Sequence, residues 1–220
     1  MTDRHARSDR PDGCVRPGWL LAPAAAVALI LLYVVAVWTV PGQVLDTQVM
    51  LAAGSVLASA TWPAQLLNAV SPATVLAVLC LLVALALGLR GTVTAVTAAA
   101  TVIGTVLASE VLKHVLVRPQ WVDDAGNSLP SGHVSAMAAL AVAAFLAVPR
   151  AARVTTAVLG ALGVIATAAA TMSLGWHRPS DVVASVLLAV GIGSAVAATA
   201  AAVPKDRSGG GSRYLPAGFS

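Results

Sequence analysis

The sequence has few charged residues, few aromatic residues and two cysteines. Charged side chains make up 10% of its 220 residues and hydrophobic side chains 58%, and the mean hydropathy is +0.87. A composition this apolar excludes a soluble domain of this length and indicates a protein embedded in a bilayer. No basic patch that would bind nucleic acid is present, so no nucleic-acid partner is expected.

The small numbers of aromatic residues and cysteines limit which fold classes are possible. Aromatic residues are 4% of the chain, whereas Ala, Val, Leu and Gly are abundant, which favours closely packed transmembrane helices over the alternating strands of a β-barrel. The fold class is therefore predicted to be all-α. Cys14 lies in a polar head and Cys80 inside an apolar run. A disulfide between them would have to cross the membrane, so no disulfide framework is expected.

Six apolar stretches have about the 18 to 22 residues that a helix needs to cross the hydrocarbon layer. We interpret the first as a retained anchor, because no small-residue cleavage site stands out after it. The intervening segment 41–70 is too polar for a clean span and is predicted to be an interfacial or re-entrant segment. The six predicted spans are 19–40, 71–89, 92–113, 132–148, 153–174 and 180–203.

The remaining residues do not form further domains. The head (1–18) and the tail (204–220) are polar and rich in Gly and Pro, and both are predicted to be disordered. Residues 19–203 are expected to form one six-helix membrane domain.

Basic residues predict the orientation of this domain, because Lys and Arg in short loops are retained on the cytoplasmic side. With six crossings and both termini cytoplasmic, three of the 13 basic residues lie on the outer side, namely Lys113, Arg118 and Arg178. The other ten lie inside: Arg4, Arg7, Arg10, Arg16, Arg90, Arg150, Arg153, Lys205, Arg207 and Arg213.

The same topology brings three polar clusters to the outer face. They are Lys113 to Pro119 after the third span, Pro130 to His133 before the fourth, and His177 to Asp181 before the sixth. Cationic side chains are expensive at membrane depth and need an anion or one another for compensation. Phosphate is the natural anion for a guanidinium and an ammonium group, so we expect these clusters to form one phosphate-handling site.

The second and third clusters contain residues whose chemistry suits a phosphate. Gly132 and Ser131 stand at a predicted helix start, where free N–H groups attract anions, although Pro-Ser-Gly alone is also ordinary turn chemistry. Asp181 follows His177 by four residues and can fix its tautomer, leaving the other ring nitrogen as a nucleophile, with His133 as the acid. A His/Asp pair alone is more often a cap or a salt bridge. The convergence of three clusters favours function.

These residues resemble the signature of the type-2 phosphatidic acid phosphatase (PAP2) superfamily over about residues 71 to 200. That signature is a Lys followed by Arg-Pro, then Pro-Ser-Gly-His, then a His with an Asp four residues later. The second part is intact as Pro130 to His133, and the third keeps His177 and Asp181. The resemblance implies a metal-independent phosphatase without a cofactor that forms a phosphohistidine on His177, oriented by Asp181, with His133 as acid and base. Lys113, Arg118, Ser131 and Gly132 would hold the phosphate.

The chain departs from the family pattern at two places. Four residues, not the usual six, separate Lys113 from Arg118, and Gln120 stands where the later Arg-Pro pair begins. In the third part, Thr171 occupies the usual position of an arginine. Arg178 is a further candidate phosphate ligand that would replace the missing charge, and interfacial snorkelling explains it equally well.

The predicted function is hydrolysis of a lipid mono- or diphosphate at the extracytoplasmic face of the cell membrane. Candidate substrates are a polyprenyl diphosphate, phosphatidic acid and phosphatidylglycerophosphate. Two alternatives stay open: a lipid phosphotransferase that uses the same intermediate, and a catalytically weak binder or transporter of phosphorylated lipid.

Overall fold

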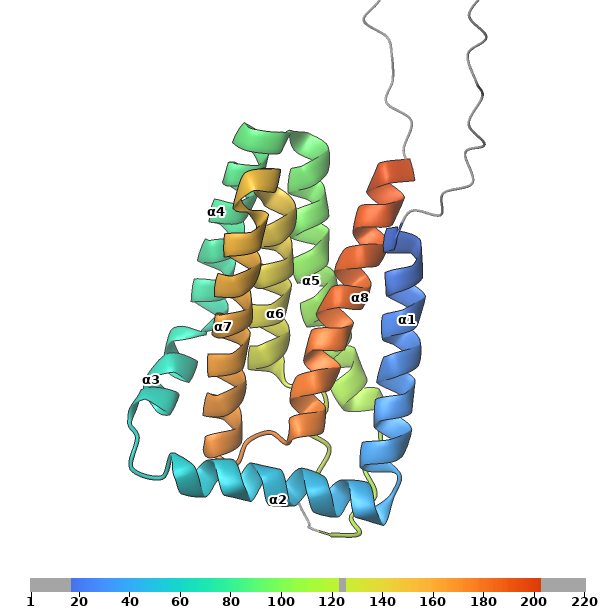
Figure 1. Ribbon diagram of the computed structural model, residues 1–220, viewed down its shortest axis with the longest axis vertical. Helices are drawn as coiled ribbons and strands as arrows, with labels where there is room; N and C mark the ends of the chain where they lie inside the picture. The colour runs from blue at the N-terminus through green and yellow to red at the C-terminus, as the bar shows by residue number, and fades with distance from the viewer. Residues whose placement is uncertain (1–16, 123–125, 203–220) are drawn as a thin grey trace, which may run out of the picture.

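The computed structural model describes residues 17–122 and 126–202, and the described chain is helical with no strand. The predicted disordered tail and nearly all of the predicted head, residues 1–16, lie outside the described residues. Six helices run alongside one another (Figure 1), and two more come between the first and the second of them in the sequence. The six are α1 (Pro17–Leu32, continued by a π-helical turn, Tyr33–Val37), α4 (Pro72–Arg90), α5 (Thr92–Val115), α6 (Gly132–Ala147), α7 (Arg153–Ser173) and α8 (Pro179–Ala202).

Five of the six predicted spans are long and apolar enough to cross a membrane, and the sixth is shorter. This shorter helix, α6, has 16 residues, or about 24 Å at 1.5 Å per residue, less than the hydrocarbon thickness of about 30 Å. It is also the central helix, since α4, α5, α7 and α8 all contact it. Surrounding helices therefore shield α6, which does not need to match the bilayer by itself. The predicted all-α six-helix bundle is confirmed.

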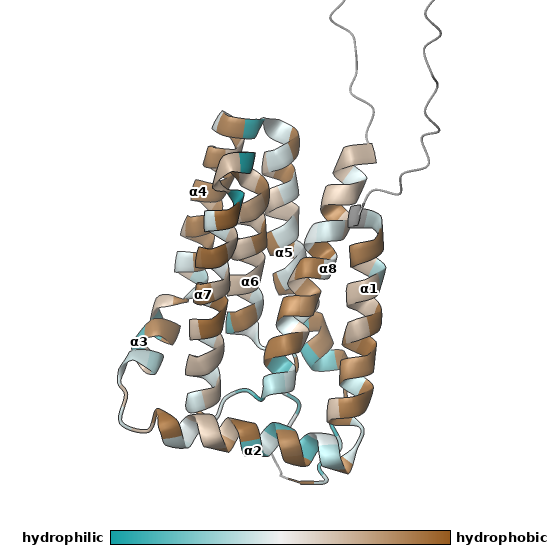
Figure 2. Cartoon of the chain, viewed as in Figure 1, coloured by the Kyte–Doolittle hydropathy of each residue, from teal (hydrophilic) through white to brown (hydrophobic). Residues whose placement is uncertain are grey.

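Small residues allow these helices to approach closely. Ala98 on α5, Ala139 and Ala143 on α6 and Ala189 on α8 are fully buried in one cluster. Large apolar side chains such as Leu81 are instead exposed on the outside. Hydrophilic residues gather toward the two ends of the bundle (Figure 2). This distribution is typical of a helix bundle whose solvent is lipid.

The segment between the first two long helices forms α2 (Val40–Val56) and α3 (Trp62–Ala69), and neither continues the bundle. Helix α2 lies across one end of the bundle and contacts α7 and α8 (Figure 1), which confirms the predicted interfacial segment. Thr39 caps α2 by accepting a hydrogen bond from the Gly42 N–H at 3.1 Å. The Gln43 side chain donates to the carbonyl oxygens of Val37 at 2.8 Å and Pro119 at 2.7 Å. The start of α2 is therefore fixed to the loop after α5.

The corner that turns the chain into α2 requires glycine at position 42. A Cβ there would overlap the carbonyl oxygen of Val35 and lie 2.8 Å from the Ala36 Cα. Gly54, later on α2, tolerates a Cβ, which would be 3.4 Å from the Ser173 carbonyl oxygen.

We expect Gly42→Ala to lower the free energy of unfolding by about 1–3 kcal/mol, because the backbone must shift to admit the methyl group. Gly54→Ala is the matched control on the same helix and should be neutral or slightly stabilising. The measurement is the apparent unfolding temperature of each purified variant in detergent. Equal temperatures for the two variants would contradict the tight corner.

Candidate active site

The three predicted polar clusters meet at the end of the bundle that α2 crosses. The described chain begins and ends at the opposite end, at Pro17 and Ala202 (Figure 1). Lys113 lies in the last turn of α5, His133 in the first turn of α6, and Asp181 in the first turn of α8. Segments more than sixty residues apart in the sequence thus become neighbours, as the topology predicted.

His177 and Asp181 form the predicted pair. The Nδ1 atom of His177 lies 3.3 Å from Oδ2 of Asp181, and the Asp181 side chain is fully buried. The backbone N–H groups of Trp176 and His177 donate to the Thr171 carbonyl oxygen, and Gly175 makes the turn with φ +69°. A carboxylate that accepts the Nδ1 proton leaves Nε2 of His177 with its lone pair, as a nucleophile requires.

Asp181 is the most connected residue of the site. Its Oδ2 atom also accepts hydrogen bonds from the Ser128 hydroxyl at 2.6 Å and from the Arg178 N–H at 2.9 Å. Its Oδ1 atom lies 3.3 Å from Nη2 of Arg118. These contacts satisfy a carboxylate that is out of reach of water and hold it in one orientation toward His177.

The start of α6 forms the second part of the site. Ser131 is the N-terminal cap, and its hydroxyl accepts a hydrogen bond from the Val134 N–H at 3.4 Å. The Lys113 ammonium lies against Gly132, at 2.9 Å from the position that a Cβ would occupy. Glu110 contacts the same ammonium at 2.7 Å. A positively charged side chain and the free N–H groups of a helix start therefore face the same place, which suits an anion.

His133 follows Gly132 and lies close to the other site residues. Its ring centroid is 5.9 Å from that of Trp176, the residue before His177. His177 and Lys113 both lie within electrostatic range of His133. The two histidines therefore approach the same space from two different helices, α6 and the turn before α8.

Arg118 is buried between two carboxylates of the site. Its side chain is 2% exposed, and the guanidinium contacts Asp46 at 3.4 Å, the Ser180 hydroxyl at 3.1 Å and Asp181 at 3.3 Å. Its Nε atom is buried without a hydrogen-bond partner among the described residues. Contact between Arg118 and phosphate stays a prediction.

Arg178 is buried next to the nucleophile candidate. The residue is 3% exposed, and its Nη1 atom donates to the Ser128 hydroxyl at 3.2 Å. Ser128 in turn donates to Asp181. This burial is inconsistent with a residue that only snorkels to the interface, and Arg178 stays a candidate phosphate ligand.

Sequence reasoning missed Asp46 and Ser128 as members of the site and gave Ser180 no role in it. Asp46 lies on α2 and is 5% exposed. Burial raises the pKa of its carboxyl group, and hydrogen bonds from Ser180 together with the Arg118 charge offset part of that rise. The available signal was a lone acid in a mostly apolar stretch, at residues 44–56. Its partners stand 72 and 134 residues away in the sequence, so the pairing could not be read from spacing.

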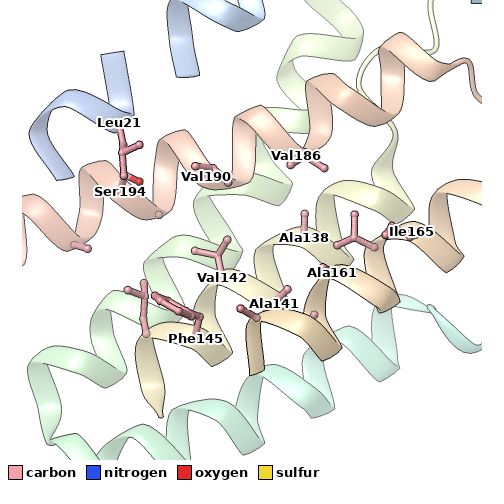
Figure 3. Close-up of a pocket in the computed structure, with 16 residues that line it drawn as sticks. Leu21, Ala138, Ala141, Val142, Phe145, Ala161, Ile165, Val186, Val190 and Ser194 are labelled. Atoms are coloured by element: carbon pink, nitrogen blue, oxygen red, sulfur yellow. The ribbon is translucent and has the colours of Figure 1, made fainter. Parts of the chain in front are cut away.

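An apolar pocket of about 570 Å³ lies farther along the same helices (Figure 3). It is bounded by α6, α7 and α8, with Leu21 of α1 on one side. Figure 3 shows Ala138, Ile165 and Val186 toward one end of the pocket and Phe145 toward the other. Ala138 and Val186 each follow a site residue, His133 and Asp181, by five positions, which is about 7.5 Å along a helix.

Comparison with known proteins identifies a family and a similar fold. The model of the PAP2 superfamily matches residues 94–204, about half of the chain. No curated protein sequence matches the chain. The crystal structure of a transmembrane PAP2-type phosphatidylglycerolphosphate phosphatase from Bacillus subtilis is similar, with a TM-score of 0.68 and 19% sequence identity. The similarity covers 84% of this chain and 98% of that one and shows a shared fold.

The position of Arg118 between two buried carboxylates predicts a large effect of its removal. We expect Arg118→Met to lower the free energy of unfolding by about 3–5 kcal/mol, because Asp46 and Asp181 would lose their shared counter-charge. Arg90→Met, at an exposed arginine near the opposite end, should cost less than about 1 kcal/mol. Apparent unfolding temperatures in detergent test this, and similar losses for both variants would contradict it.

Proposed function

The chain belongs to the PAP2 superfamily, and we propose that it is an integral-membrane phosphatase that hydrolyses the phosphomonoester or diphosphate of a lipid. The observation that carries the proposal is the meeting of two groups at one end of the bundle. His177, held by the buried Asp181, supplies the nucleophile. Lys113 and the first turn of α6 supply the positive environment for a phosphate. The similarity in fold to a lipid phosphatase supports the same reading.

The reaction proceeds in two displacements. In the first, Nε2 of His177 attacks the phosphorus, a P–N bond forms, and the P–O bond to the lipid breaks while His133 protonates the leaving oxygen. In the second, His133 takes a proton from water, the water oxygen bonds to phosphorus, and the P–N bond breaks. Inorganic phosphate leaves and both histidines regain their starting states. The His177 ring becomes positive when Nε2 bonds to phosphorus, and Asp181 stabilises that charge.

Charge on the phosphoryl oxygens is balanced by groups of the chain itself. Lys113 provides an ammonium, Gly132 permits close approach to the N–H groups of α6, and the Ser131 hydroxyl keeps a donor while its oxygen caps the helix. Arg178, the residue after His177, adds a further positive charge, and Arg118 offsets part of the negative charge of Asp46 and Asp181. Because these groups supply the cations that phosphoryl transfer needs, we propose a metal-independent reaction.

The apolar pocket supports a lipid substrate. It begins about 7.5 Å along α6 and α8 from His133 and Asp181, and apart from Ser194 its lining residues are apolar or glycine. A hydrocarbon chain in the pocket would leave the headgroup phosphate at the site. Polyprenyl diphosphate, phosphatidic acid and phosphatidylglycerophosphate all fit this description.

We propose that the site faces the extracytoplasmic side of the cell membrane. Arg90 is the last residue of α4, Arg150 lies just before α7, and Arg153 is the first residue of α7. All three therefore lie at the end of the bundle opposite the site. The positive-inside rule assigns that end, with both termini, to the cytoplasm.

The central experiment measures phosphate release by the purified protein in detergent from the three candidate lipid phosphates. We expect His177→Asn to lose activity entirely and His133→Asn to lose about 10²–10⁴-fold, as removal of a general acid does. His114→Asn, at an exposed histidine close to Lys113, is the matched control and should match the wild type. Activity that survives the His177 change would contradict the mechanism, and phosphorylated acceptor without free phosphate would indicate a transferase.

Metal independence gives a separate prediction. Phosphate release should be unchanged within about twofold after dialysis against EDTA, because side chains alone provide the positive charge at the site. The control is the same preparation with Mg²⁺ restored. A loss in EDTA that Mg²⁺ reverses would show that a metal takes part.

A further inference from the structure

Asp46 is a buried acid that the phosphatase mechanism above does not use. It lies on α2, the helix across the end of the bundle, and both of its carboxylate oxygens are engaged. Oδ1 accepts a hydrogen bond from the Ser180 N–H at 2.8 Å, and Oδ2 accepts from the Ser180 hydroxyl and from Arg118. Removing a carboxylate from water costs several kcal/mol unless partners compensate it. Such a residue needs an explanation in the structure around it.

The first partner of Asp46 is the start of α8. Ser180 is the second residue of that helix and directly precedes Asp181. A carboxylate that accepts a helix-start N–H satisfies an otherwise unpaired donor and interacts favourably with the helix dipole. Asp46 therefore caps α8 from another helix and fixes the turn on which Asp181 stands.

The second partner is Arg118, which bridges Asp46 and Asp181. The guanidinium contacts Oδ2 of Asp46 at 3.4 Å and Oδ1 of Asp181 at 3.3 Å. His177 contacts the other oxygen of Asp181, Oδ2. The four side chains thus form a continuous row, from Asp46 through Arg118 and Asp181 to His177.

Charge balance along this row gives Asp46 its role. Arg118 carries one positive charge, and the two carboxylates carry two negative charges when ionised. With Asp46 ionised, one negative charge remains to stabilise the His177 ring when it becomes positive. Without the Asp46 charge, Arg118 would neutralise Asp181, and the His177 ring would lose that stabilisation.

We propose that Asp46 is a positioning residue for the phosphatase reaction, acting on Asp181 through Arg118 and Ser180 without touching the substrate. The proposal rests on the proposed function. It assigns a part in the reaction to α2, which carries none of the family's signature residues.

The test is a double-mutant cycle on phosphate release with Asp46→Asn, Asp181→Asn and the double variant. We expect Asp46→Asn to lower kcat about 10–100-fold and to leave KM within about twofold. Losses of this size follow when a residue that orients a metal ligand is removed from a metal site. Added to Asp181→Asn, Asp46→Asn should cost no more than about twofold, because its route of action is already gone. Gln48→Ala, at an exposed position on α2, is the control and should behave as the wild type.

Each outcome decides between a positioning role and a structural one. A purely structural role predicts independent losses that multiply in the double variant, and that result would overturn the proposal. An active wild type with an equally active Asp46→Asn variant would overturn it as well and leave the phosphatase assignment intact. A wild type that releases no phosphate would instead remove the proposed function, and the positioning role with it.

The folding of every variant in the cycle is checked as well. The apparent unfolding temperature of each variant shows whether a lost rate reflects lost fold. If Asp46→Asn does not give folded protein, Ser180→Ala takes its place in the cycle, because it removes the hydroxyl that contacts Asp46 and Arg118. The same lack of additivity with Asp181→Asn is expected, and multiplying losses again overturn the proposal.

Discussion

A carboxylate buried at the end of a membrane bundle must be surrounded by donors, and the site depends on that requirement. Asp181 is fully buried, so water cannot solvate it. Its donors come from the loop after α5, from the loop before α6 and from the turn before α8. Each of these segments is thereby held within hydrogen-bond distance of one side chain. The same contacts that satisfy Asp181 also assemble the residues that surround the two histidines.

The fold makes this arrangement possible by keeping its central helix short. Because α6 has 16 residues and is enclosed by α4, α5, α7 and α8, its first turn can lie at the polar end without facing lipid. Small residues such as Ala139 and Ala143 let the neighbouring helices approach it closely. Lys113 then reaches Gly132 from α5. The close packing inside the bundle therefore also positions the residues at its end.

Much of this structure could be predicted from the sequence, because the bilayer imposes strong rules. Hydrocarbon thickness fixes the length of the spans, and basic residues predict which ends lie together. That reasoning predicted the six helices, the transverse segment and the meeting of Lys113, His133 and His177. It did not place the Arg118 guanidinium on Asp46, because a motif gives the position of a residue and not the direction of its side chain. Asp46 itself belongs to no motif, and its contacts depend on how α2 crosses the bundle.

The transverse position of α2 also makes the site depend on the position of a whole helix. Its 17 residues form an arm of about 25 Å, fixed at one end by the tight Gly42 corner and continued at the other by the chain leading to α3. Because Asp46 lies on this arm and contacts Ser180 and Arg118, any displacement of α2 must also displace the row of side chains that ends at His177.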